Sequence, residues 1–257
     1  MNILFIGIGE IGRSVANLYK DANLYYIDPV VKDTIITTEG LEIKELLNNT
    51  NPPVIDVCHI CCGYFKGYVN NIADYLNTYN PNLTIIEGTV PIGITRDLYR
   101  YTDKRIVHSP VMGKHPNLTK SILTFDKVVA GVDPVVTYEA LQHFEDLNVK
   151  VVTFNKPEES EAAKLLDTTY YGWNILFMKY AHKFCEDRGL DFEKVYTTWN
   201  NIYNEGYTAM GNPEFVRPIL KYTQGKIKGH CIIPNMEILK KDFIPAKIGL
   251  KLNEEEV

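Results

Sequence analysis

The sequence predicts an α/β fold, in which a doubly wound parallel sheet over residues 1–155 is followed by a smaller all-α domain over residues 156–257. Two observations lead to this prediction. Short apolar runs alternate with helical segments up to about residue 155, as parallel strands alternate with their crossover helices. From Pro157 an uninterrupted helical stretch follows, roughly 30 residues or about 45 Å long, which we expect to be the central helix of the second domain.

The first strand, helix and second strand lie between Asn2 and Asp28. The run Ile3–Ile6 is continuously apolar, as expected of a parallel strand that is buried on both faces. A glycine-rich turn and a helix over 13–20 follow, and a second strand over 24–27 ends just before Asp28. This order is that of a Rossmann-type βαβ unit.

The glycine-rich turn has the G-x-G-x-x-G pattern of dinucleotide-binding proteins. Gly7 permits the tight turn, Gly9 lets the backbone approach a pyrophosphate, and Gly12 lets the helix pack closely on the strand. The N–H groups of the helix start, at Glu10 and Ile11, would then hold the phosphates. The alternative is a structural βαβ turn without a ligand.

The identity of the cofactor depends on Asp28, which lies 21 residues after Gly7. An acid at this position can accept hydrogen bonds from both ribose hydroxyls of the adenosine. A 2′-phosphate there would meet a carboxylate, and the nearest cation is Lys32. The sequence therefore predicts NAD rather than NADP.

The rest of the first domain reads as alternating elements. We expect strands over 54–62, 83–87, 105–108, 127–131 and 149–154, helices over 41–48, 64–79, 95–101 and 138–147, and a loop or helix over 109–125. Cys58, Cys61 and Cys62 fall on the first of these strands, where alternation sends Cys61 to the opposite face. We interpret them as small buried residues and predict no metal site.

Composition narrows the classes of partner. The net charge is −5 and no basic run occurs, so nucleic-acid binding is not expected. No apolar segment approaches the length of a membrane span, and no signal peptide is recognisable. Five cysteines suit a reducing cytosol better than a disulfide framework, which predicts a cytoplasmic protein. The expected partner is a small-molecule substrate.

The helix predicted from Pro157 to Arg188 carries apolar residues around most of its circumference. A single sheet domain cannot bury so wide an apolar surface, so we predict a homodimer with this helix at its centre; the simpler interpretation is a buried helix of a small α-domain. A second helix over 191–203 and a frayed tail over 253–257 are expected after it.

Three stretches outside the glycine turn could carry chemistry. Residues 87–93 follow a strand at its carboxyl end, where ligands bind in open α/β sheets. Lys164 lies in the second turn of the long helix, and Cys231 lies in a small-residue loop after Lys226 and Lys228. Neighbouring cations can favour a thiolate, although Cys231 alone could equally be structural.

Together these stretches resemble the UDP-glucose/GDP-mannose (nucleotide-sugar) dehydrogenase family over about residues 1–235. The matching segments are GIGEIG, EGTVPIGITR with Thr89 on the family's threonine, His108-Ser109-Pro110, Glu161-Ala162-Ala163-Lys164-Leu165, and Gly229-His230-Cys231-Ile232 with Pro234. The resemblance implies oxidation of a primary alcohol on a sugar by two successive hydride transfers to NAD. It also implies that Cys231 is the nucleophile, that Lys164 stabilises developing negative charge, and that Thr89 positions a water or the substrate in one shared site.

The chain departs from the family pattern at several of these positions. Val111 and His115 stand where the family has two glutamates, the second of which is associated with thioester hydrolysis; Thr168 replaces the asparagine four residues after the lysine, and Asn235 stands where an acid is expected. We also expect the family's third, nucleotide-sugar-binding domain to be absent. If His115 does not act as the base, the enzyme should either stop at the aldehyde or accumulate a thioester on Cys231, with fewer than two NADH per substrate.

Two further interpretations remain open. A relative of the β-hydroxyacid dehydrogenases would use Lys164 without a cysteine nucleophile, and a dinucleotide-binding protein would turn nothing over. Replacement of Cys231 distinguishes a β-hydroxyacid dehydrogenase from a nucleotide-sugar dehydrogenase-like enzyme. A redox assay with added alcohols distinguishes both enzymes from the binding protein.

Overall fold

The structure, a computed structural model, describes residues 1–46, 52–113, 116, 118–229 and 231–255. It divides into two compact units, Met1–Lys164 and Leu165–Val257. The first is an α/β unit and the second is helical, which confirms the predicted fold class. The predicted domain boundary at 155/156 stays a prediction.

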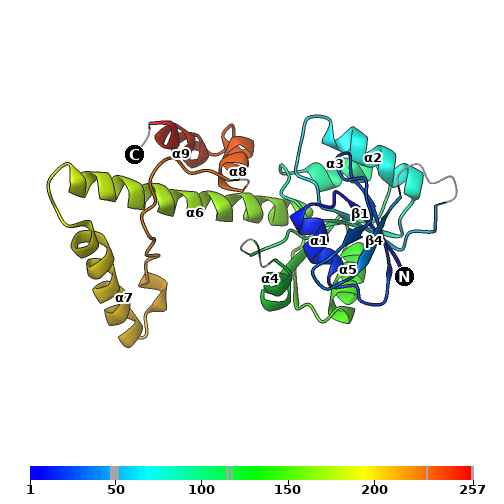
Figure 1. The fold of residues 1–257 in the computed structure, drawn as a ribbon, viewed down its shortest axis with the longest axis horizontal. Coiled ribbons are helices and arrows are strands. Elements are labelled where there is room, and N and C mark those ends of the chain that lie inside the picture. Colours follow the sequence, from blue (N-terminus) through cyan, green and yellow to red (C-terminus); the bar gives the residue numbers. More distant parts are fainter. Residues whose placement is uncertain (47–51, 114–115, 117, 230, 256–257) are drawn as a thin grey trace. The chain divides into compact units, whose positions relative to one another are not determined.

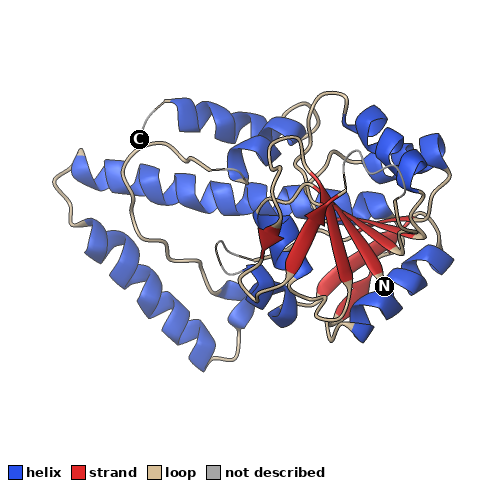
Figure 2. Cartoon of the chain, turned by 45° about the vertical axis from the view of Figure 1, so that its right-hand side comes forward, coloured by secondary structure: helices blue, strands red, loops and turns tan. Residues whose placement is uncertain are grey.

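Among the described residues, the first unit contains one nine-stranded sheet with the order β3-β4-β2-β1-β5-β6-β7-β8-β9. Figure 2 shows its strands in red. The strands are β1 Asn2–Ile6, β2 Asn23–Ile27, β3 Ile35–Ile36, β4 Glu42–Glu45, β5 Val57–Ile60, β6 Leu83–Ile86, β7 Ile106–His108, β8 Lys127–Gly131 and β9 Val151–Thr153. Neighbouring strands are parallel except for β3–β4 and β7–β8. The chain winds outward from β1 in both directions, so the carboxyl ends of β1 and β5 form the switch point of the sheet.

Helices cover both faces of this sheet (Figure 1). They are α1 Glu10–Ala16, α2 Tyr68–Tyr79, α3 Ile94–Thr102, α4 Leu118–Thr124 and α5 Pro134–Asp146. One apolar core lies between the sheet and α1, α4 and α5, and a second lies between the sheet and α2 and α3. Burial of the central strands on both faces explains their continuously apolar sequences.

The prediction of a helix over 41–48 is wrong. Residues 42–45 form β4, which pairs in parallel with β2 and in antiparallel with β3. Ile43 is fully buried while its neighbours Glu42 and Lys44 are exposed, which is the alternation of a half-covered strand near a sheet edge. An apolar pattern this short is compatible with both the helical and the strand periodicity, and the pairing with β2 makes it a strand.

The helix α6, Pro157–Glu186, begins in the first unit and continues into the second, and the structure confirms its predicted length. A π-helical turn Glu193–Thr198, α7 Trp199–Ala209, a 3₁₀ turn Pro213–Phe215, α8 Ile232–Leu239 and α9 Ile244–Glu254 follow. An irregular segment after α7 crosses α6 before α8 begins (Figure 1). A small core forms around Leu165, Met236, Leu239 and Ala246. The predicted frayed tail is wrong at Asn253, which is buried in α9.

Candidate active site

The glycine-rich turn connects β1 to α1 with little room to spare. Gly7 adopts a φ of +88°, which L side chains rarely adopt, and a Cβ there would lie 2.8 Å from the backbone nitrogen of Cys62. A Cβ on Gly12 would lie 2.5 Å from the carbonyl oxygen of Gly7, whereas one on Gly9 would meet nothing within 4 Å. The turn is therefore packed against the sheet on one side and open at Gly9, beside the exposed Glu10 and the half-buried Ile11 of α1.

Asp28 at the end of β2 is bonded to this turn. Its Oδ2 accepts from the N–H of Ile8 at 3.0 Å, and its Oδ1 accepts from Val30 and Val31 at 2.9 and 3.1 Å. Partial burial works against ionisation, but these backbone bonds lower the pKa of Asp28 below its usual value. A carboxylate offers about four acceptor positions, so the second lone pair of Oδ2 is left for a ligand hydroxyl.

The segment after β6 lies beside the same end of the sheet. A Cβ on Gly88 would lie 2.8 Å from the carbonyl oxygen of Cys62, the same residue that crowds Gly7. The carboxyl ends of β1, β5 and β6 therefore meet closely at Cys62. Thr89 lies three residues after the end of β6 and is half-buried, next to the fully buried Val90. It therefore follows the carboxyl edge of the sheet, where ligands bind in such folds.

The first turns of α6 are joined to this edge through Glu161. The buried carboxylate of Glu161 accepts from the N–H groups of Gly93 and Thr95 at 2.5 and 2.8 Å and from the hydroxyl of Thr95 at 2.7 Å. It thereby caps α3. Burial raises the pKa of Glu161 even though these bonds oppose the rise. One turn earlier, Glu158 pairs with Arg96 at 2.5 Å, so the residues that lead to Lys164 are held against α3.

A buried histidine makes the second connection; it lies in one of the family-like segments, but the sequence predicts no role for it. His108 at the end of β7 lies 2.9 Å from Ser160 Oγ through Nδ1 and 3.2 Å from the carbonyl oxygen of Gly88 through Nε2. Burial lowers the pKa of His108 to about 4, so the ring is neutral at pH 7. A carbonyl can only accept, so Nε2 donates to Gly88 and Nδ1 accepts from Ser160. His108 thus ties the residue before Thr89 to the turn of α6 that precedes the half-buried Lys164.

A chain of buried polar groups lies below the same edge. Glu87 Oε2 lies 2.7 Å from Lys127 Nζ, and its Oε1 lies 2.9 Å from His59 Nδ1. His59 Nε2 is 2.5 Å from the hydroxyl of Tyr19, which is 2.6 Å from His143 Nε2. Burial raises the pKa of Glu87, but the ammonium of Lys127 and the bond from His59 outweigh it, so the pKa is lowered overall. Glu87, which immediately precedes Gly88, is thereby held as a carboxylate.

In the second unit, Cys231 is exposed and directly precedes α8. Thr168 donates to the carbonyl of Leu165 at 3.1 Å and accepts from Asn235 Nδ2 at 2.8 Å. Two of the residues that depart from the family pattern, Thr168 and Asn235, are therefore bonded to each other and join α8 to α6. His115 lies outside the described residues.

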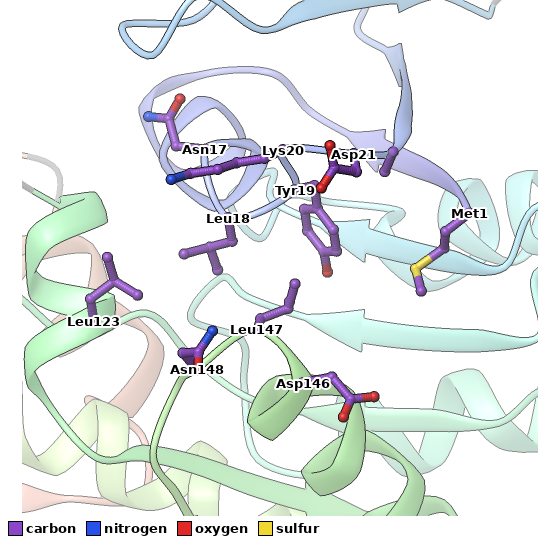
Figure 3. A pocket seen from close by; sticks show the side chains of 11 residues that line it. Met1, Asn17, Leu18, Tyr19, Lys20, Asp21, Leu123, Asp146, Leu147 and Asn148 are labelled. Atoms are coloured by element: carbon purple, nitrogen blue, oxygen red, sulfur yellow. The ribbon is translucent and has the colours of Figure 1, made fainter.

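A pocket at the other end of the sheet is not part of this arrangement. Figure 3 shows it between the end of α1, at Leu18 and Lys20, and the end of α5, at Leu147 and Asn148. It opens at the amino ends of β1 and β2, where doubly wound sheets do not bind their cofactors. Within the described ranges, no group of three or more His, Cys, Asp or Glu side chains could hold a metal ion, and no helix is long and apolar enough to cross a bilayer.

Comparison with known proteins shows which enzymes this chain is similar to. No protein-family model matches the chain. It is 27% identical over 265 residues to the UDP-N-acetyl-D-mannosamine dehydrogenase of Methanocaldococcus jannaschii, an alignment that covers 90% of this chain and 59% of that protein. This chain is related to the nucleotide-sugar dehydrogenases. The enzyme of the same name from Methanococcus vannielii is 24% identical over 171 residues, covering 66% of this chain and 36% of its own. The chain thus spans less than two thirds of these relatives.

Solved structures share the fold. The UDP-D-ManNAc dehydrogenase of Pyrococcus horikoshii superposes with a TM-score of 0.75 at 18% identity, covering 99% of this chain and 68% of that one. A UDP-glucose dehydrogenase from Pyrobaculum islandicum gives 0.71 at 13% identity, with coverages of 99% and 68%. The 3-hydroxyisobutyrate dehydrogenase of Mycobacterium tuberculosis gives 0.65 at 13% identity, with coverages of 98% and 91%. A Rossmann-type sheet followed by helices is therefore common to both dehydrogenase groups.

Proposed function

We propose that this protein is an NAD-dependent dehydrogenase that oxidises a hydroxyl group of a sugar or sugar-nucleotide-like substrate in the cytoplasm. The observation that carries the proposal is the turn between β1 and α1, where Gly7 and Gly12 leave no room for side chains and Gly9 leaves open space. The relationship to nucleotide-sugar dehydrogenases supports the substrate class. The odd count of five cysteines suits a reducing compartment better than a disulfide framework.

The residues present fit a dinucleotide. The open backbone at Gly9 and the N–H groups at the start of α1 would bind the pyrophosphate. Asp28, held as a carboxylate, would accept from a ribose hydroxyl through its remaining lone pair. The bound dinucleotide would supply a hydride acceptor.

The remaining groups would act on the substrate. Thr89 would orient the reacting hydroxyl or a water, and the ammonium of Lys164 would stabilise negative charge as it develops on oxygen. The thiolate of Cys231 would add to the carbonyl carbon of the aldehyde, so that carbon–sulfur bond formation retains the intermediate for a second oxidation. Thr168 is bonded to Asn235 and would act through the position of α8.

The direct test combines binding and turnover. Calorimetry should show that NAD binds to the full chain. With an alcohol from a panel of UDP-hexoses and simple β-hydroxyacids, the absorbance of NADH at 340 nm should rise. Cys231→Ser should abolish acid formation while NAD still binds. Turnover by Cys231→Ser at the wild-type rate would favour a β-hydroxyacid dehydrogenase mechanism. NAD binding without turnover of any alcohol would indicate that the protein only binds the dinucleotide.

A further inference from the structure

The buried Lys179 on α6 makes an unusual contact within the second unit. Its side chain is 3% exposed, and its ammonium donates to the carbonyl oxygen of Thr223 and, at 2.6 Å, to that of Gly225. The same nitrogen lies 5.4 Å from the centre of the Tyr222 ring. A buried ammonium is costly unless its donors are satisfied, so Lys179 holds this irregular segment in one place.

A second contact holds the same segment from α9. The buried Asn253 accepts from the N–H of Ile227 at 2.7 Å and donates to the carbonyl oxygen of Ile227 at 3.3 Å. Both backbone groups of one residue are thus bonded to one side chain. The neighbouring Lys226 pairs with Glu254 at 3.3 Å. Residues 223–227 are therefore fixed by α6 on one side and by α9 on the other.

The fixed segment leads directly to the candidate nucleophile. Cys231 follows Ile227 by four residues, a span of at most about 14 Å. Four residues further on, Asn235 of α8 is bonded to Thr168 of α6 at 2.8 Å. The position of the thiol is therefore limited from both directions along the chain, and the limit on the amino side depends on Lys179 and Asn253.

We propose that Lys179 and Asn253 are positioning residues that order the segment before Cys231 and hold the thiol at the amino end of α8. The proposal rests on the proposed function for its catalytic consequence, since only a nucleophilic Cys231 needs such placement. Without the two contacts the segment before Cys231 is no longer held, so the thiol is not kept in one position. Loss of the contacts should therefore change the rate of alkylation and slow turnover.

The test compares Lys179→Met, Asn253→Leu and the conservative Lys179→Arg with Lys183→Met, which alters an exposed lysine one turn further along α6. In the full chain, trypsin cleavage after Lys226 and Lys228 should accelerate at least tenfold in the first two variants. The rate at which iodoacetamide alkylates Cys231, the one exposed cysteine of the five, should change at least threefold, as followed by peptide mass spectrometry. Lys183→Met should match the wild type, and Lys179→Arg should recover most of both rates.

Turnover provides the readout that a purely structural role would not move. The kcat should fall at least tenfold in Lys179→Met and Asn253→Leu while the Kd for NAD stays within twofold, which also shows that the first unit is folded. Wild-type cleavage and alkylation rates in both variants would overturn the proposal, as would faster cleavage with unchanged alkylation and kcat. If the wild type oxidises no alcohol, the proposed function fails, and the cleavage and alkylation rates still decide whether Lys179 and Asn253 position the thiol.

Discussion

Several polar side chains near the candidate cofactor site are already bonded to the backbone, which determines what each can still do. Asp28 accepts three N–H groups from two loops. It therefore both closes the glycine-rich turn and offers its remaining lone pair to a ligand. Glu161 and His108 also bond to backbone groups around Thr89. Substitution of such residues should change both stability and binding.

The first prediction concerns Asp28. Asp28→Asn should weaken NAD binding about tenfold, since it replaces a charge-assisted hydrogen bond to a ribose hydroxyl by a neutral one. NADP should bind the wild type more weakly than NAD, because its 2′-phosphate would meet a carboxylate, and the variant should discriminate less. Calorimetry with both cofactors measures all four constants. Tighter binding of NADP by the wild type would contradict the assignment.

The second prediction concerns Glu87. Glu87→Gln removes the carboxylate partner of the buried Lys127, and breaking a buried pair in this way costs about 3–5 kcal/mol. Glu39→Gln, at an exposed position, should leave the free energy of unfolding unchanged within about 0.5 kcal/mol. Urea denaturation of both variants at pH 7 measures the difference. A similar midpoint for the two would show that the buried pair contributes little.

The third prediction concerns pH. The pKa of His108 is lowered by burial from 6.5 to about 4 in the folded chain. Between pH 6.5 and 4 this imidazole is therefore protonated in the unfolded chain but not in the folded one. Stability should therefore fall as the pH falls from 6.5 towards 4, by about 3 kcal/mol for this group. His108→Asn should lose this part of the slope. Urea denaturation of the wild type and of His108→Asn at pH 7 and 4.5 tests this. The same loss of unfolding free energy between the two pH values in both proteins would refute it.

Sequence patterns located residues whose role depends on local spacing. Gly7, Gly9, Gly12 and Asp28 follow one another within a single βαβ unit, so their arrangement could be predicted from the chain alone. The bonds of His108 to Ser160 and Gly88 join positions that are 52 and 20 residues away. A lone histidine at the end of an apolar strand has no local signal for such partners, and only the sheet order brings them together.

At the scale of elements, α6 could be predicted because its length and apolar coverage are local properties. The sequence pattern does not predict the helices α8 and α9, because Pro and Gly punctuate the chain after Gly211. These helices owe their stability to packing on α6, since Met236 and Ala246 are fully buried in the core they share with Leu165. Tertiary contact, rather than helical propensity, decides their structure.

The fourth prediction tests that packing at Gly172. A Cβ there would lie 2.5 Å from Met236 Cε and 2.6 Å from Ile232 Cγ2, so Gly172→Ala should push α8 away and cost about 1–3 kcal/mol. In α7, a Cβ on Gly206 would meet nothing within 4 Å, so Gly206→Ala should stabilise the helix by about 0.5–1 kcal/mol. Thermal unfolding of the two variants should move in opposite directions. Stabilisation by both would mean that α8 yields without cost.

At the scale of the whole molecule, exposed aromatic residues remain on the second unit. Tyr170, Phe177 and Phe184 are 63%, 67% and 49% exposed and lie seven residues apart, so they share one face of α6. The helix α7 has no buried residue. Apolar faces of this kind are unusual on monomers, which supports the proposed homodimer around α6.

The fifth prediction is the mass in solution. Light scattering at micromolar concentration should report about twice 29.4 kDa, and Phe177→Asp should reduce the mass to that of one chain because it places a charge in the aromatic face. Val30→Asp, at an exposed apolar position of the first unit, should leave the mass unchanged. A wild-type mass of one chain would refute the dimer.

The division of the chain at 164/165 has a consequence for biosynthesis. Each unit is one unbroken stretch of sequence, and every strand of the described sheet, together with Ser160 and Glu161, lies in the first. The sheet can therefore close while the rest of α6 is still inside the ribosome, as domains commonly fold in order of synthesis. Ribosome-bound chains stalled far enough beyond Lys164 for the first unit to clear the exit tunnel should already resist protease across that unit.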